Sequence, residues 1–401
     1  MVAPAVIATG LDRLLADPRR LAGRRFGLLA HGAAVTGDLR PVHLALTETG
    51  SRPERLFGPE HGFHGVEQDM VASADQVDPW SGVPIVSLYG DDASSLVPDR
   101  RAFEGLDLLV IDLQDIGTRY YTYAATAVWA AEAALAAGLE VLVLDRPNPL
   151  GGEVVEGNLP EPGFDSFVGA FRMPVRHGLT LGEIVRLEGR RRGWAEERVA
   201  FVAMEGWRRG QMWSDLGRPW IAPSPNMPDF ATALLYPGLC LLEATEFSEG
   251  RGTTRPFRLF GGPGVDPVAL ASALAPLAPL GVRALPTCFR PWHQKHRGEV
   301  CGGVELAVIS PRRVAGLRIG IEVLAALHRV AAGNFAWRAA PYEFVTDRPA
   351  IDLLAGSAAP REALDAGDAA GLDAWMATWT ADEEAFRAER REILIYPEEA
   401  R

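Results

Sequence analysis

Residues 56–65 carry the side chains best suited to acid–base chemistry in this chain. Their sequence is Leu-Phe-Gly-Pro-Glu-His-Gly-Phe-His-Gly, which places Glu60, His61 and His64 among glycines and a proline. We expect a short strand at 55–57 to lead into this loop. Open α/β sheets place catalytic side chains on loops beyond strand ends, and a plain turn needs neither the acid nor the imidazoles. We therefore predict that the loop belongs to a catalytic site.

Four further clusters of polar side chains are candidates for the same site, at 112–123, 176–178, 223–228 and 248–254. Each also has a structural interpretation. Tyr120 and Tyr123 have the spacing of one helix face, and Asn226 between prolines is a common turn residue. The cluster at 248–254, Ser-Glu-Gly-Arg-Gly-Thr-Thr, offers little for packing. For this cluster we favour a functional role.

Several other chemistries lack their motifs. The single lysine, Lys295, follows Trp-His-Gln, so no Walker A loop is present. No Gly-x-Ser-x-Gly elbow, no His-Glu-x-x-His and no Gly-x-Gly-x-x-Gly after a strand occurs. These gaps argue against a dinucleotide cofactor and a zinc site, so we predict neither a cofactor nor a metal. Carboxylates and histidines among Tyr, Trp, Asn and Arg suit a carbohydrate, which needs aromatic faces, polar groups and acid–base catalysis.

The composition restricts partners and location. With 48% hydrophobic and 23% charged residues the chain is typical of a globular protein. A net charge of -12 argues against nucleic acid. The longest apolar tract, 124–138, is too short to span a bilayer, so we predict no membrane partner.

The first ten residues lack a basic export region, and the 3 cysteines are odd in number, so we expect a cytoplasmic protein. Oligomeric state is left open.

The elements that must position these residues alternate between strands and helices. We expect buried strands at 25–30, 55–57, 85–89, 106–112 and 140–145, with a helix at 120–137 between the last two. This order predicts a Rossmann-like parallel sheet with its site at the carboxyl ends of the strands. A loop-rich passage at 151–174 leads us to divide the chain into domains 1–165 and 166–401.

The second part has weaker patterns. Thr180 and Glu183 form a capping box that opens a helix toward Arg192. We expect strands at 199–204, 282–286 and 304–309. We expect helices at 234–244, from 267 onward and at 316–331. The charged segment 382–394 is interpreted as a solvated surface helix.

Six motifs in order resemble those of the NamZ/YbbC family: 57–62, 113–121, 144–149, 174–178, 223–228 and 248–254. The resemblance extends from about residue 10 to beyond residue 390. It implies an exo-β-N-acetylmuramidase, a glycoside hydrolase that releases N-acetylmuramic acid from the non-reducing end of peptidoglycan fragments. It also implies a smaller C-terminal α/β domain, with the active site in the cleft between the domains. The catalytic glutamate proposed for the family corresponds to Glu60.

With this resemblance we assign candidate roles. The candidate catalytic residues are Glu60, His61, Asp115 and Glu249. The candidate substrate-binding residues are His64, Gln114, Arg119, Tyr120, Tyr123, Arg146, Asn148, Arg176, His177, Ser224, Asn226 and Arg251. In our hypothesis Glu60 protonates the glycosidic oxygen and Asp115 or Glu249 is its partner. Arg119, Arg176 and Arg251 are candidates for holding the lactyl carboxylate of the sugar, because a guanidinium binds a carboxylate bidentately.

Several alternatives remain open at this point. The partner carboxylate could activate water or orient the substrate's N-acetyl group, so retaining, inverting and substrate-assisted routes are all possible. A sugar-binding or regulatory relative without turnover, and a hydrolase of amide or phosphate ester bonds, are the rival functions. The sequence departs from many relatives at Ala30-His31 and at Glu246, and an extra carboxylate there could change the charge of a subsite.

Overall fold

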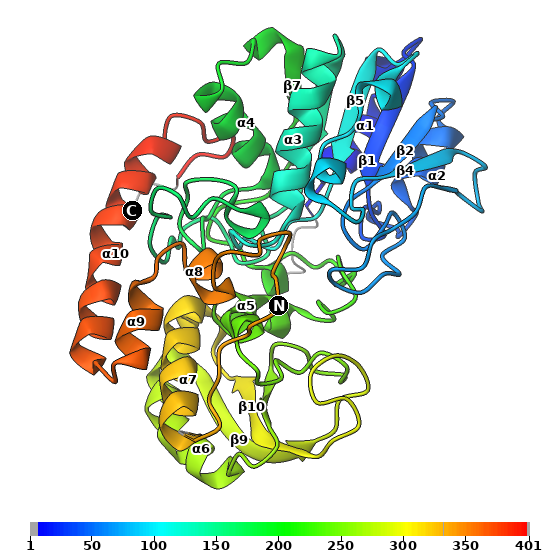
Figure 1. Cartoon of the computed structure of the whole chain (residues 1–401). Coiled ribbons are helices and arrows are strands. Elements are labelled where there is room, and N and C mark those ends of the chain that lie inside the picture. The colour runs from blue at the N-terminus through cyan, green and yellow to red at the C-terminus, as the bar shows by residue number, and fades with distance from the viewer. Residues whose placement is uncertain (1–6, 332, 399–401) are drawn as a thin grey trace.

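The computed structural model describes residues 7–331 and 333–398. It contains two α/β units, one above the other in Figure 1. The N-terminal unit holds a seven-stranded sheet, and the C-terminal unit holds a three-stranded sheet. We take the N-terminal unit to end before α5 and the C-terminal unit to begin with it.

The elements have the following bounds. The strands are β1 (Phe26–Ala30), β2 (Arg55–Gly58), β3 (Gln76–Val77), β4 (Pro84–Ser87), β5 (Leu108–Asp112), β6 (Glu140–Leu144), β7 (Val199–Val202), β8 (Leu259–Gly262), β9 (Val282–Phe289) and β10 (Cys301–Val308). The α-helices are α1 (Gly10–Ala16), α2 (Val42–Glu48), α3 (Tyr123–Ala136), α4 (Leu181–Arg191), α5 (Phe230–Leu239), α6 (Pro267–Leu274), α7 (Gly316–Val330), α8 (Ala350–Ala355), α9 (Ala359–Asp365) and α10 (Ala369–Arg390). Short 3-10 turns connect several of them.

The large sheet has the strand order β3-β4-β2-β1-β5-β6-β7, and all its pairs are parallel except β3 with β4. Without the short edge strand β3, this is the order 3-2-1-4-5-6 of a doubly wound dinucleotide-binding fold. The order reverses between β1 and β5. The predicted Rossmann-like sheet is thus confirmed, although the chain lacks the glycine fingerprint of that fold.

Alternate residues along the central strands face different helices. Leu108 and Val110 pack in one core with residues of α1 and α2. Leu109 and Ile111 pack in a second core with the alanines of α3, and this core continues into the C-terminal unit. Because both faces of the sheet are covered, its strands are continuous apolar runs. The sheet is therefore a rigid base, and loops project toward the C-terminal unit from the carboxyl-terminal ends of its strands (Figure 1).

Two boundaries differ from the sequence-based expectations. Strand β7 pairs with β6 in parallel, so the large sheet continues well past residue 165. A division that keeps this sheet whole falls after β7. Helix α3 begins at Tyr123 rather than at residue 120, so Tyr120 lies in the loop before the helix. The capping box at Thr180 is present and opens α4 as expected.

Helix α10 contains most of the segment 382–394, which is largely exposed or half-buried, with the side chains of Phe386, Arg390 and Ile393 buried. It starts at Ala369 and buries Trp375, Trp379 and Phe386. After it, the tail returns to the large sheet, where the Tyr396 hydroxyl donates to Asp145 at 2.8 Å. Burial raises the pKa of Asp145 to about 7. The C-terminal segment therefore holds the two units together.

Helices α5 and α7 of the C-terminal unit touch through their backbones. A Cβ atom on Gly238 would lie 2.0 Å from the carbonyl oxygen of Gly316, and one on Gly320 would lie 2.3 Å from the Cα of Gly238. Only glycine allows helices to approach this closely. The contact fixes α5, which begins directly after the polar cluster 223–228.

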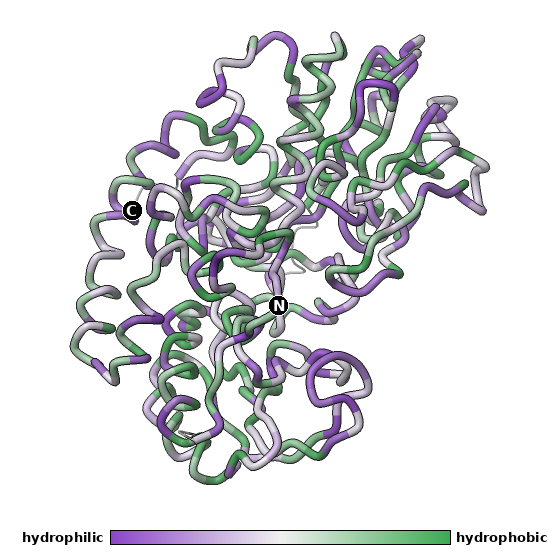
Figure 2. The backbone as a smooth tube through the Cα atoms, in the orientation of Figure 1, coloured by the Kyte–Doolittle hydropathy of each residue, from purple (hydrophilic) through white to green (hydrophobic). Residues whose placement is uncertain are grey.

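Hydropathy follows this organisation. In Figure 2 hydrophobic segments gather inside both units, while hydrophilic ones gather in loops and outer helix turns. Among residues 7–331 and 333–398, no helix combines the length and the apolar character that crossing a membrane requires.

Candidate active site

A hollow of about 450 Å³, its solvent-facing mouth included, lies between the two units. The N-terminal unit and the loop that follows its sheet contribute one wall, and the C-terminal unit contributes the other. The lining residues are Glu60, His61, Asp69, Tyr120, Tyr121, Thr122, Val168, Ser224, Asn226, Met227, Tyr236, Glu243, Arg251, Phe257, Tyr342 and Glu343. Of the residues proposed from the sequence, this hollow brings together Glu60, His61, Tyr120, Ser224, Asn226 and Arg251.

The loop after β2 turns sharply to present Glu60. A Cβ on Gly58 would lie 2.6 Å from the backbone nitrogen of Phe63, so the loop folds back closely on the strand end. His61 and Gly62 both have positive φ angles, 71° and 78°. For His61 this conformation is costly and is typical of functional sites. The glycines of the motif therefore serve the geometry that places the acid.

Glu60 is buried and accepts two hydrogen bonds. The Thr122 hydroxyl donates to Oε2 at 2.8 Å, and the backbone N–H of Met70 donates to Oε1 at 3.4 Å. Both partners are donors, which suits an ionised carboxylate because that group can only accept. Thr122 was not among the residues singled out from the sequence, although it lies within the predicted cluster 112–123.

The two histidines of the loop have different surroundings. His61 contacts the carbonyl oxygen of Glu67 through Nδ1 at 3.0 Å, so Nδ1 is the donor of this hydrogen bond. His64 lies outside the hollow, and its Nε2 is 2.9 Å from Oδ1 of Asp78. His61 is therefore the imidazole available to a substrate.

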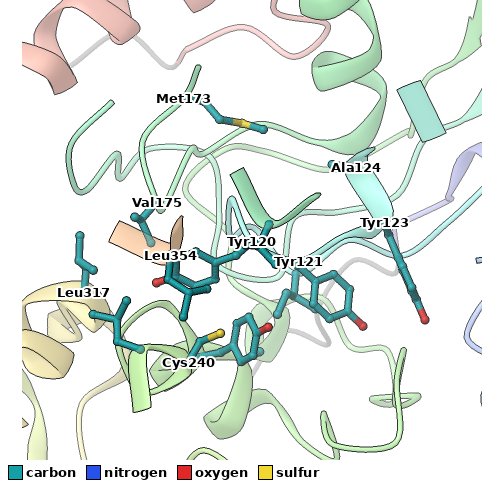
Figure 3. Close-up of a cluster of buried hydrophobic side chains, with 14 of the residues drawn as sticks. Tyr120, Tyr121, Tyr123, Ala124, Met173, Val175, Cys240, Leu317 and Leu354 are labelled. Carbon is teal, nitrogen blue, oxygen red and sulfur yellow. The ribbon is translucent and has the colours of Figure 1, made fainter. Parts of the chain in front are cut away.

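The tyrosines before α3 form the floor of the hollow. Figure 3 shows Tyr120 and Tyr121 pointing in opposite directions, with Tyr120 toward Leu317 and Leu354. The Tyr120 hydroxyl bonds the carbonyl of Pro237. Tyr123 does not line the hollow, but its hydroxyl donates to the carbonyl of Pro223 at 2.9 Å. Tyr121 lines the hollow, and its hydroxyl lies beside those of Ser224 and Tyr123.

On the opposite wall Arg251 is surrounded by acids. Its NH1 lies 3.0 Å from Asp69, its NH2 lies 2.7 Å from Glu243, and its Nε lies 3.5 Å from Glu249. Lys295 adds a second cation, 2.9 Å from the other oxygen of Glu249. Burial is the largest single influence on the pKa of Asp69 and acts to raise it, but the charge of Arg251 and the hydrogen bond from Gln294, with smaller contributions, together lower the pKa. Two cations and three carboxyl groups thus form one network of ion pairs at this wall.

One acid of the hollow escaped the sequence analysis altogether. Glu343 comes from the loop between α7 and α8 and is almost fully buried. Its Oε2 accepts a hydrogen bond from the Tyr89 hydroxyl at 3.0 Å. The local sequence Pro-Tyr-Glu-Phe has no glycine or histidine to mark it. Only the fold brings it into the same lining as Glu60.

The two acids expected to be partners of Glu60 do not reach the hollow. Asp115 is buried after β5, where Oδ2 accepts the N–H of Gly117 at 2.6 Å and lies 3.6 Å from His177 Nε2. His177 is fully buried and lies outside the lining as well. Glu249 is held between Arg251 and Lys295. Asp115, His177 and Glu249 therefore stabilise the segments around the hollow without lining it.

Two of the three arginines considered for substrate binding hold backbone segments instead. Arg119 donates to carbonyl oxygens of Asn158, Met173, Leu354 and Ala355. Arg176 donates in the same way to Leu150 and Val314. Both are buried and neither lines the hollow. Because the N–H groups of both guanidinium groups already donate to backbone carbonyl oxygens, neither arginine is available to bind the lactyl carboxylate of a substrate.

The remaining candidates also lie outside the hollow. Asn148 donates to the carbonyl of Leu179 at 2.9 Å. Arg146 pairs with Asp112, and together with Gln114 it borders a separate hollow of about 300 Å³ near the sheet's reversal point. These residues stabilise the loops beyond β5 and β6.

The structure places both positions at which the sequence analysis expected a departure from relatives, His31 and Glu246. His31 is buried at the end of β1, where Nε2 accepts the N–H of Gln114 at 2.9 Å and Nδ1 contacts the carbonyl of Pro223 at 3.1 Å. Burial lowers the pKa of His31 to about 3, so the ring is neutral. Glu246 is exposed and lies outside the hollow, so it does not add charge to its lining.

A doubly wound sheet with a carboxylate-lined hollow between it and a second α/β unit defines an α/β enzyme, and the comparisons with known proteins specify which. Residues 26–231 match the family model "Exo-beta-N-acetylmuramidase NamZ, N-terminal", and residues 234–396 match the corresponding C-terminal model. The chain belongs to the NamZ family of exo-β-N-acetylmuramidases.

Individual relatives agree with this assignment. The chain is 34% identical over 392 residues to the peptidoglycan beta-N-acetylmuramidase NamZ of Bacillus subtilis (strain 168), covering 97% of this chain and 91% of that protein. Two crystal structures of DUF1343 family proteins from Bacteroides fragilis NCTC 9343 have the same fold. The first has a TM-score of 0.83 and 30% sequence identity, and the match covers 97% of this chain and 99% of that protein. The second has a TM-score of 0.74 and 26% sequence identity, and the match covers 98% of this chain and 100% of that protein.

Proposed function

We propose that this chain is an exo-acting glycoside hydrolase that releases N-acetylmuramic acid from the non-reducing end of peptidoglycan fragments. The observation that supports the proposal most directly is the place of Glu60. It is a buried carboxylate with two donors, and it faces a hollow that both units of a NamZ family member enclose. Two carboxyl groups across one hollow are what hydrolysis of a glycosidic bond requires.

The lining suggests roles for its other groups. His61 offers a ring nitrogen to a sugar hydroxyl, and Ser224 and Asn226 offer further polar atoms. Of the arginines considered, Arg251 is the one that faces the hollow, so it is the candidate for the lactyl carboxylate. A bound carboxylate there would share the guanidinium with Asp69.

The test compares a chromogenic β-N-acetylmuramide with the matching β-N-acetylglucosaminide. We expect release from the muramide alone, and we expect Glu60→Gln to lower kcat/KM about 10³-fold, the range of lost acid–base catalysis. Glu246→Gln, a change at an exposed acid outside the hollow, is the control and should match the wild type. Equal cleavage of both sugars would mean that the lactyl group is not recognised. Release from neither would contradict turnover and favour a sugar-binding protein.

For the compartment we propose the cytoplasm. Cys240, Cys288 and Cys301 are all free thiols, which is typical of a reducing environment. Fractionation of cells that express the tagged chain tests this, and recovery outside the cytoplasm would contradict it.

A further inference from the structure

We infer that Glu343 is the carboxylic acid that protonates the departing oxygen, while Glu60 is the ionised carboxylate on the other wall. This inference rests on the proposed glycosidase function and names the second carboxyl group of its site. It replaces the hypothesis from the sequence that Glu60 supplies the proton.

The first argument is position. Glu343 and Glu60 line the same hollow, one from each unit. The other acids of the hollow, Asp69 and Glu243, are both paired with Arg251. Glu343 instead has the uncharged Tyr89 hydroxyl as its hydrogen-bond partner. Unlike Asp69 and Glu243, Glu343 therefore has no paired cation, among the residues that the structure describes, that would favour loss of its proton.

The second argument is backbone conformation. Glu343 and Phe344 have φ angles of 44° and 68°, and Tyr342 and Val345 exchange backbone hydrogen bonds of 3.0 and 2.9 Å around them. Two consecutive residues with positive φ are typical of a tight type I′ turn, where Asn-Gly is favoured. A glutamate and a phenylalanine in this turn cost conformational free energy. Strain of this kind persists where the surroundings enforce it, and it gathers at functional sites.

Aromatic packing enforces the turn. The Phe344 ring lies 5.4 Å from the ring of Tyr89 and 6.4 Å from that of Phe167, measured between centroids. Tyr89 thus contacts both residues of the turn, the ring of one and the carboxyl group of the other. This arrangement fixes the carboxyl group of Glu343 in the wall of the hollow.

The third argument is electrostatic. Burial is the main cause that raises the pKa of Glu343 well above its usual value, and the charge of Glu60 raises it further. Glu243 and Asp69 act in the same direction, whereas donation from Tyr89 lowers it in part. Asp165 borders a second hollow that Glu343 also reaches. Two carboxyl groups that face each other divide the roles of acid and base when their surroundings separate their pKa values.

The chemical step is balanced as follows. The O–H proton of Glu343 passes to the glycosidic oxygen, and the electron pair of the breaking C1–O bond stays on that oxygen. The leaving sugar departs as an alcohol. Water supplies the hydroxyl group that ends on C1, directly or after attack by the acetamido oxygen, and its remaining proton restores the carboxyl pair. Glu60 accepts the proton on the attacking side.

The experiment compares Glu343→Gln and Glu60→Gln on two substrates with different leaving groups. One is a 2,4-dinitrophenyl β-N-acetylmuramide, whose leaving group needs no proton, and the other is the β-1,4-linked disaccharide of N-acetylmuramic acid and N-acetylglucosamine. We expect Glu343→Gln to lose about 10³-fold in kcat/KM on the disaccharide and less than about tenfold on the dinitrophenyl substrate. We expect Glu60→Gln to lose activity on both.

Tyr89→Phe is the second variant, because it removes the donor to Glu343 but keeps the ring. Since that donor lowers the pKa of Glu343, we expect the alkaline limb of the kcat/KM profile to move to higher pH. Three outcomes would each overturn the inference. Glu343→Gln could lose equal activity on both substrates, or the alkaline limb of the Tyr89→Phe profile could stay at the wild-type pH. Glu60→Gln, and not Glu343→Gln, could be the variant whose loss depends on the leaving group. A wild-type protein that cleaves neither substrate would contradict the proposed function itself.

Discussion

The two walls of the hollow hold their acids in different ways. On the N-terminal wall Glu60 is held by a hydroxyl and a backbone amide. Around Arg251 of the C-terminal wall, Glu243 of the same wall and Asp69 of the N-terminal unit are held by the charge of the guanidinium. Uncharged donors fix the position of a carboxylate and leave its charge for a reacting group, whereas an ion pair neutralises that charge. The comparison indicates that the acids held by uncharged donors, Glu60 on the first wall and Glu343 on the second, are available to react, whereas the acids around Arg251 provide stability and shape.

The largest effect is expected from removing the cation of the second wall. Arg251→Met would leave Asp69, Glu243 and Glu249 as buried acids without this partner, and breaking a buried ion pair typically costs about 3–5 kcal/mol. Urea unfolding of the variant and the wild type measures the difference. An unfolding free energy within 1 kcal/mol of wild type would remove the distinction between the walls.

A smaller effect is expected on the first wall, and on activity instead of stability. Thr122→Val keeps the shape of the side chain and removes the donor to Glu60, which costs about 1–1.5 kcal/mol and therefore about tenfold in kcat/KM. Thr122→Ser, which keeps the hydroxyl, is the matched control. A loss of stability in Thr122→Val with unchanged turnover would place Thr122 with the structural residues.

The smallest effect concerns acid stability. Because the folded pKa of Asp69 is lowered, its contribution to stability is present above the unfolded value near 3.8 and is lost as the pH falls through the folded pKa. The unfolding free energy of Asp69→Asn should therefore decrease less than that of the wild type on acidification from pH 5 to pH 3. Parallel decreases, measured by denaturant unfolding at each pH, would contradict an ionised Asp69 in the network.

The sequence predicts the first wall better than the second for a physical reason. The strands leading to Glu60 are continuous apolar runs, and the glycines and proline around the acid are neighbours in the chain. Glu343 owes its place to the packing of Phe344 against Tyr89 and Phe167, residues that are remote in sequence. Its turn also lacks the Asn-Gly pair by which such turns are recognised.

The arginines illustrate the same limit. Arg119, Arg176 and Arg251 all stand in polar motifs, and residue type alone cannot separate them. The carbonyl partners of Arg119 come from three segments, near residues 158, 173 and 354. A side chain that ties such segments together can be recognised only after the fold is known.

The contact between Gly238 and Gly320 has a consequence for the evolution of this site. Helix α5 carries Tyr236 into the lining, and its distance from α7 is set by two backbones without intervening side chains. One added methyl group would displace the helix, so Gly238→Ala would look like a catalytic mutation although residue 238 is outside the hollow. Because the distance between α5 and α7 cannot change, adaptation of the site to a different sugar would have to come from substitution of the side chains that line the hollow.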